Sequence, residues 1–144
     1  MSSSDQHRFA MQIAQMSRAW RAELDRRLVG LGLSQARWLV LLHLARFDEL
    51  PTQRELAQSV GVEGPTLARL LDSLEAQGLV SRQAVPEDRR AKKIALSPQA
   101  EPLIKKIEAI STELRKELFA GIDEQDLDRC QQVHAKILSN LERR

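Results

Sequence analysis

Apolar residues recur at three- and four-residue steps over most of this 144-residue chain. This spacing is typical of one face of an α-helix. The first such stripe consists of Phe9, Ile13, Met16, Trp20, Leu24, Leu28 and Leu31. Two later stripes consist of Leu103, Ile107, Ile110, Leu114 and Leu118, and of Leu127, Cys130, Val133, Ile137 and Leu141. A chain patterned in this way is expected to fold mainly as helices that pack on one another.

Between the long stripes lie shorter helices with clear boundaries. The first of them is predicted over Ser34–Phe47, with Ser34 as its N-cap. Thr52–Glu55 fits a capping box, in which each side chain satisfies a free backbone N–H at a helix start. Gly61 supplies a tight turn, and Pro65 lies in the first turn of the next helix, which is predicted to end at Gly78.

The helical period breaks only after that glycine. Leu79–Gln83 and Lys92–Leu96 are predicted to be two short strands, and Pro86–Arg90 the polar tip that joins them. Ser97–Pro98 is an N-cap followed by a first-turn proline, so another long helix is expected there. The predicted fold is therefore mainly α with one small β-hairpin, in a single domain that spans residues 1–144.

Composition excludes several classes of protein. Aromatic residues make up only 3% of the chain, and the single cysteine, Cys130, rules out an internal disulfide framework. No run of about 18 apolar residues predicts a membrane span, and the N-terminus lacks the pattern of a secretory signal. We therefore expect a cytoplasmic protein that does not insert into a membrane.

Positive charge is concentrated in one short segment. The whole chain carries a net charge of only +2. Residues 81–93 hold five cationic and two anionic side chains, a net of +3, which leaves −1 for the rest of the chain. The cationic residues of this segment are Arg82, Arg89, Arg90, Lys92 and Lys93.

The two helices on either side of Gly61 have the proportions of a helix-turn-helix, whose second helix enters the DNA major groove. The residues predicted to face DNA at the start of this recognition helix are Gly64, Pro65, Thr66 and Arg69. Arg69 is the strongest candidate for a base contact, because a guanidinium contacts guanine O6 and N7 in a bidentate manner. The alternative is that Arg69 is a solvated surface charge, for which Asp72 and Ser73 are candidate partners.

A helix-turn-helix followed by a cationic hairpin is a winged helix. Arg89 and Arg90 at the tip are predicted to enter the minor groove, where the potential is most negative. Arg82, Lys92 and Lys93 are assigned to the same DNA-facing wing. We expect Asp88 to pair with one arginine and hold the loop in shape, because a carboxylate that faced DNA would repel it. The alternative is a basic hairpin without a partner.

The sequence also resembles a known family. Residues 88–97 are similar to the wing signature of the MarR family of bacterial transcription regulators, and residues 64–82 resemble its recognition helix and first wing strand. The SlyA branch is the most similar, through residues 18–21, Arg37–Trp38 and residues 88–92. The likeness covers nearly the whole chain and keeps the order of its elements.

This resemblance implies a homodimer that binds a palindromic operator in double-stranded DNA. Residues 34–96 would form the winged-helix core, and residues 7–31 and 97–143 the dimerisation helices. The apolar stripes agree with this expectation, since burying one leucine is worth about 1.5–3 kcal/mol. The alternative is that the terminal helices fold back on the winged helix within a monomer.

Members of the family often release DNA when a small aromatic acid binds, and Arg18, Trp38 and Leu42 match residues that line this effector cleft. Arg18 would supply a cation and Trp38 a flat apolar wall. Leu42 replaces a histidine of the SlyA branch, and His43 lies one position away. The alternative is that Trp38 belongs to the core and Arg18 is an ordinary surface charge.

No pattern in the chain predicts an enzyme, a cofactor or a metal site. His7, His43 and His134 lie in three separate predicted helices without zinc-ligand spacing, and there is no glycine-rich phosphate loop. We expect His43 at the edge of the core and Cys130 as a small residue of the dimer interface, the alternative for Cys130 being an oxidant sensor. The alternative function is a winged helix that binds another protein instead of specific DNA.

Overall fold

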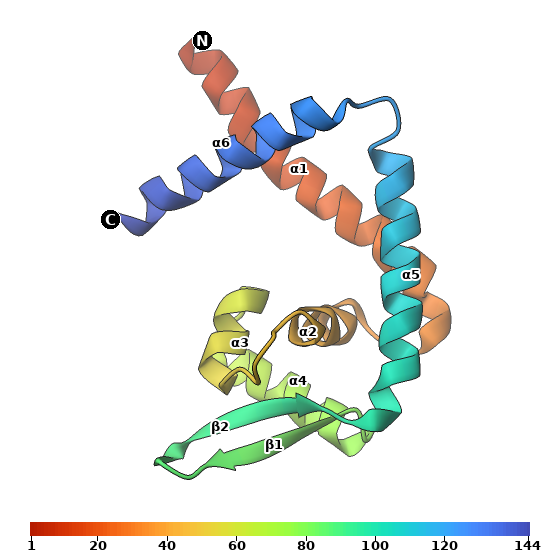
Figure 1. Cartoon of the computed structure of the whole chain (residues 1–144). Coiled ribbons are helices and arrows are strands. Elements are labelled where there is room, and N and C mark those ends of the chain that lie inside the picture. Colours follow the sequence, from red (N-terminus) through yellow and green to blue (C-terminus); the bar gives the residue numbers. More distant parts are fainter. The chain divides into compact units, whose positions relative to one another are not determined.

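The computed structural model describes residues 1–144 and every side chain except those of Gln35 and Arg89. Six α-helices and a two-stranded antiparallel hairpin follow the predicted order (Figure 1). The helices are α1 (Ser3–Leu28), α2 (Gln35–Ala45), α3 (Gln53–Val60), α4 (Gly64–Ala76), α5 (Glu101–Leu118) and α6 (Glu124–Glu142). The strands are β1 (Val80–Val85) and β2 (Asp88–Leu96), and single 3₁₀ turns follow α1 and precede α5. The predicted fold class is confirmed.

The chain divides into two compact units, Met1–Thr112 and Glu113–Arg144. The first unit contains α1 to α4, the hairpin and most of α5, and the second contains the end of α5 and α6. No single helix among the described residues is both long enough and apolar enough to cross a bilayer.

Helix α2 forms the centre of the first unit. Trp38, Val40, Leu41 and Leu44 are all buried, and these positions cover several sides of the helix. A helix that is apolar around its circumference must be surrounded by other elements. The indole Nε1 of Trp38 donates a hydrogen bond to Asp25 Oδ1 at 3.1 Å, which satisfies the buried N–H and ties α2 to α1.

The helix-turn-helix is shaped by local sequence signals. Thr52 Oγ1 accepts a hydrogen bond from the Glu55 amide at 3.1 Å, and Glu55 Oε1 accepts one from the Thr52 amide at 3.0 Å. The predicted capping box is confirmed, and its backbone and side-chain hydrogen bonds lower the pKa of Glu55. Gly61 ends α3 with φ +84° and donates its N–H to the Ala57 carbonyl at 2.9 Å. This left-handed residue turns the chain into α4.

The hairpin is longer than predicted, and its turn is only Pro86–Glu87. The paired register runs from Val80↔Leu96 to Ala84↔Lys92 and then jumps to Val85↔Asp88. Residues 89–91 have no partner on β1, so they form a bulge that lets pairing continue beyond the predicted strand ends. Arg90 therefore lies within β2 and not at the tip, which corrects the sequence prediction.

A third segment completes this small sheet. Thr52 forms a bridge with Lys93, and the Ile94 amide donates to the Pro51 carbonyl at 2.9 Å. Strand β2 is thus paired on both sides, with β1 and with the residues just before α3. This arrangement attaches the wing directly to the start of the helix-turn-helix.

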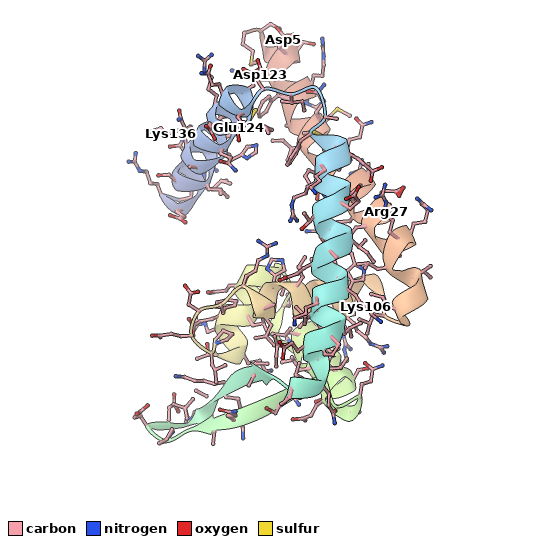
Figure 2. All side chains as sticks on the ribbon, turned by 45° about the vertical axis from the view of Figure 1, so that its right-hand side comes forward. Asp5, Arg27, Lys106, Asp123, Glu124 and Lys136 are labelled. Carbon is pink, nitrogen blue, oxygen red and sulfur yellow. The ribbon has the colours of Figure 1, made fainter. Side chains whose placement is uncertain are left out.

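Helices α1 and α6 leave most of their apolar residues uncovered, whereas Ile104, Ile107 and Leu114 of α5 are buried within the single chain. In α1 only Leu24 and Leu28 are buried, while Phe9, Ile13 and Met16 are exposed. All side chains of α6 are described and none of them is buried. Figure 2 shows charged side chains such as Glu124 and Lys136 projecting from α6, and the acidic residues of its first turn suit the positive end of the helix dipole.

Candidate nucleic-acid interface

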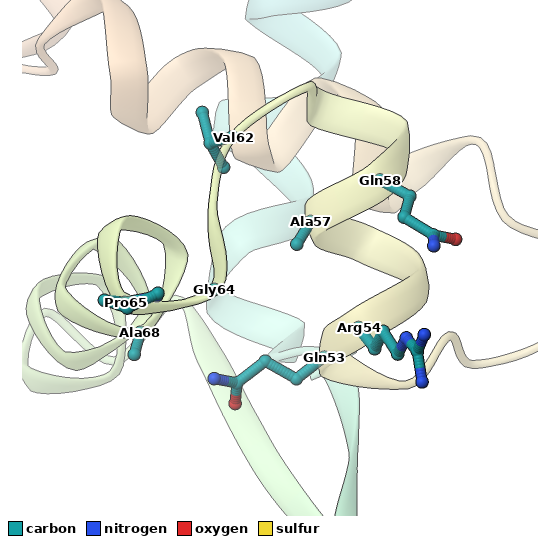
Figure 3. Close-up of a pocket in the computed structure, with 8 residues that line it drawn as sticks. All are labelled: Gln53, Arg54, Ala57, Gln58, Val62, Gly64, Pro65 and Ala68. Carbon is teal, nitrogen blue, oxygen red and sulfur yellow. The ribbon is translucent and has the colours of Figure 1, made fainter.

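The starts of α3 and α4 border a hollow of about 560 Å³ (Figure 3). Its lining comes from both helices and the turn between them, through Gln53, Arg54, Ala57, Gln58, Val62, Gly64, Pro65 and Ala68. Gln53 reaches toward α4, whereas Arg54 and Gln58 extend along the outer side of α3. The first helix of a helix-turn-helix crosses the DNA backbone. These three polar residues were not predicted from the sequence, although their outward positions on the helix were a usable signal.

The predicted recognition residues lie at the exposed start of α4. Gly64 and Pro65 form its first turn, Thr66 is half-buried and Arg69 is exposed. Among the described side chains the Arg69 guanidinium has no hydrogen bond or ion pair. Asp72, its partner in the alternative interpretation, is bound to Arg82 at 2.8 Å. Arg69 is therefore not paired with Asp72 and remains an exposed charge.

The cationic residues of the wing are exposed where they are described. Arg90, Lys92 and Lys93 all face solvent, and the Arg89 side chain lies outside the described residues. Neighbouring strand residues point to opposite faces of a sheet, so Lys92 and Lys93 cannot both contact the same phosphate. Lys93 lies beside the start of α3, where its charge contributes to the lowered pKa of Glu55.

Asp88 binds the backbone of the bulge. Its Oδ1 accepts a hydrogen bond from the backbone amide of Arg90 at 3.0 Å. The described partner is a main-chain N–H two residues on, a common local arrangement for aspartate. The predicted pairing of Asp88 with Arg89 lies outside the described side chains. A free N–H in the bulge is satisfied in this way.

Arg82 faces α4, which corrects its assignment as a DNA contact. Its side chain is 18% exposed, with Nη1 placed 2.8 Å from Asp72 Oδ1 and 3.3 Å from Glu75 Oε1. Nη2 donates to the Ala68 carbonyl at 2.9 Å. The physical reason is strand alternation: Arg82 is paired with buried Ile94, so both side chains point to the face that packs on the helices.

Comparisons with known proteins agree with this geometry. Residues 31–91 match the model of the MarR family. The solved transcriptional regulator PA3341 is 68% identical over 94% of this chain and 99% of its own, with a TM-score of 0.90. The chain belongs to the MarR family of transcriptional regulators.

Two further solved structures share the fold. CouR from Rhodococcus jostii RHA1, bound to p-coumaroyl-CoA, is 25% identical over 90% of both chains, with a TM-score of 0.79. S. aureus MepR, in a complex with DNA, is 22% identical over 92% of this chain and 97% of its own, with a TM-score of 0.77. This MarR-family chain is a DNA-binding regulator of transcription, not an enzyme.

The three residues predicted to line an effector cleft in this MarR-family chain differ in exposure. Arg18 is exposed and Leu42 is half-buried, but Trp38 is only 1% exposed and its indole N–H is bound to Asp25. The alternative interpretation of Trp38 as a core residue is confirmed. The indole is therefore enclosed in the single chain, and the effector cleft at Arg18, Trp38 and Leu42 stays a prediction.

A different hollow, of about 210 Å³, lies nearby. It is lined by Arg21 of α1, Ala36 and Leu39 of α2, Val60 and Val62 around the α3–α4 turn, and Leu70 of α4. Leu70 is half-buried. One arginine among five apolar residues is a suitable lining for a small anion with an apolar body.

His43 lies close to this hollow, at the edge of the core. Its Nδ1 is 2.8 Å from Ser59 Oγ, which links α2 to α3. Burial lowers the pKa of His43, and the positive charges of Arg46 and Arg21 lower it further. Both the burial of His43 and the two nearby arginines therefore disfavour its charged form.

Proposed function

We propose that this chain acts in the cytoplasm as a homodimer that binds a palindromic operator. Helix α4 lies in the major groove, and the wing reaches the adjacent minor groove. The observation that carries this proposal is the exposed Arg69 guanidinium at the start of α4, which has no partner among the described side chains. A buried or paired arginine at this position would argue against base recognition.

The side-chain chemistry of each residue determines its proposed role in the interface. Arg69 reads a guanine edge, a contact worth about 1–3 kcal/mol of discrimination, and Thr66 bonds a base or a phosphate. Gly64 and Pro65 let the backbone approach closely, since neither carries a long side chain. Arg89, Arg90, Lys92 and Lys93 supply the wing contacts, which add affinity without reading every base. Gln53 and Arg54 hold the strand that crosses α3.

The dimer accounts for the apolar stripes of the flanking helices. Val133 and Leu141 of α6 are 47% and 60% exposed, and Phe9 and Ile13 of α1 are also exposed. We propose that residues 7–31 and 97–143 bury these stripes against a second copy, with residues 34–96 as the DNA-binding core. A two-fold dimer presents its two recognition helices about 34 Å apart, one turn of DNA.

Selection from random duplex DNA tests this function. The full chain should enrich one motif whose two half-sites are inverted and lie about 10 base pairs apart, centre to centre. Sequencing of the bound fragments gives the motif, and competition with random duplex gives the specificity. Enrichment of no motif would contradict operator binding and would favour the alternative winged helix that binds a protein.

The same protein is proposed to be released from DNA by a small aromatic carboxylate. The hollow at Arg21 supports this second function, because it joins one cation to apolar walls. Its volume is below the range of about 300–1,000 Å³ for drug-sized ligands, so the occupant is small. Val60 and Val62 flank the α3–α4 turn, and a ligand wedged against them shifts the helix-turn-helix only if it binds one conformation better than the other.

Arg21→Ala should raise the benzoate concentration needed to release the selected duplex by about tenfold or more. The lost interaction is a charge-assisted hydrogen bond, worth about 1.5–3 kcal/mol. Fluorescence anisotropy of labelled duplex during a benzoate titration measures the midpoint. Arg18→Ala is the matched control, one turn earlier on α1 and outside the hollow lining. A large shift in Arg18→Ala with none in Arg21→Ala would favour the original sequence prediction.

A further inference from the structure

Arg82 joins the wing to the recognition helix through several contacts at once. Its guanidinium lies along one face of α4, contacting acceptors of residues 68, 72 and 75. These positions are four and three residues apart, so they line one side of the helix. The backbone amide of Arg82 also donates to Glu75 Oε2 at 3.3 Å. Glu75 therefore holds both the main chain and the side chain of the same strand residue.

These contacts cover an open edge of the sheet. Strand β1 pairs only with β2, and its other edge would present unpaired N–H groups to solvent. At Arg82 that N–H points to the Glu75 carboxylate instead. The edge of the wing is thus attached to α4 at a defined distance and angle.

The contacts are better placed than those of an ordinary surface ion pair. Exposed pairs contribute little, because water screens the charges and two flexible side chains must be ordered. The Arg82 side chain is only 18% exposed and is held by three acceptors. A planar guanidinium with several donors is suited to such a site, whereas an ammonium is not.

The same contacts keep Asp72 away from Arg69. These two residues are three positions apart on α4, a spacing at which side chains of opposite charge readily pair. Asp72 Oδ1 is instead 2.8 Å from Arg82 Nη1. The arrangement leaves the Arg69 guanidinium exposed at the start of the helix.

We propose that Arg82 is a positioning residue for DNA recognition, which fixes the wing relative to α4 so that both engage one duplex together. This inference rests on the proposed function. Arg82 itself touches no DNA. It acts through the wing cations, above all Arg90. By holding β1 and β2 in place, it lets those side chains reach the minor groove of the DNA, next to the major groove that α4 occupies.

A double-mutant cycle tests the proposal with the duplex selected by the wild-type chain. Arg90→Ala should weaken binding severalfold in the wild-type background but less than twofold in an Arg82→Ala background, because the wing has already disengaged there. Arg82→Ala should also lower the salt slope by about two to three ions, more than the single charge that it removes. Equal effects of Arg90→Ala in both backgrounds would overturn the proposal.

Controls separate positioning from loss of fold or charge. Arg46→Ala removes an exposed arginine at the C-terminal end of α2, outside the recognition helix, the wing and the dimerisation helices, and should leave the slope unchanged. Arg82→Lys keeps the positive charge but loses the planar guanidinium with its several donors. It should lower the affinity for DNA and the salt slope by less than Arg82→Ala does, and it should leave the midpoint of urea unfolding unchanged. An Arg82→Lys chain that binds like the wild type would also overturn the proposal.

If the wild-type chain selects no duplex, the proposed function fails; if it binds and the cycle is additive, only the role of Arg82 fails.

Discussion

Val133→Glu should convert the proposed homodimer to a monomer and remove tight operator binding. Val133 lies in the apolar stripe of α6 and is 47% exposed in the single chain. A second copy that covered this stripe would bury the new carboxylate without a partner, which costs several kcal/mol. Loss of the dimer also loses the second half-site, and linked binding is worth about 10²- to 10⁴-fold in affinity.

Light scattering at micromolar concentration gives the mass of this variant, and anisotropy with the selected duplex gives its affinity. Gln132→Glu is the matched control. It adds the same charge one residue away, at an exposed position about 100° around the helix from Val133. The control should remain dimeric and bind normally. A dimeric Val133→Glu chain would rule out α6 as the dimer contact.

Arg69→Ala should lower the preference for one base pair in each half-site and leave the rest of the motif intact. The expected loss of discrimination is about 1–3 kcal/mol, up to roughly a hundredfold. The effect is large because the Arg69 guanidinium is exposed and has no partner among the described side chains. It gives up no protein contact when it binds DNA, so all of its bonding capacity goes to the base.

Lys92→Ala is the comparison variant for this prediction. Lys92 is an exposed wing residue, and its loss should weaken all duplexes about equally and lower the salt slope by about one ion. Binding to a panel of duplexes with single base changes separates the two patterns. If Arg69→Ala weakened every duplex by the same factor, Arg69 would be a phosphate contact and not a reader of sequence.

Local signals predicted the elements of the fold well. The capping box at Thr52 and the turn at Gly61 depend on residues within a few positions of each other. Such interactions are set by the neighbouring sequence alone. The register of the hairpin was less predictable, because the bulge at residues 89–91 depends on which residues of β1 and β2 find each other in space.

The position of a site residue could be predicted from the sequence where its exposure depends only on the helix that carries it. Arg69 could be placed on the outer face of α4 from helical spacing. Arg82 could not, because the face of β1 that meets α4 depends on the packing of the hairpin. Arg21 was missed for the same reason, since its hollow is assembled from four helices and a turn.

For this protein, the amino-acid sequence alone determined where helices begin and end, which segments form the two strands of the hairpin, and where positive charge is concentrated. Those properties follow from hydrogen bonds and spacing over a few residues. Only the tertiary structure decided that Trp38 is enclosed, that Arg82 binds α4 and that Arg69 remains exposed. Each of these depends on contacts between segments that are distant along the chain. Local sequence patterns do not show which side chains those contacts bury, or which of several possible partners a polar group binds.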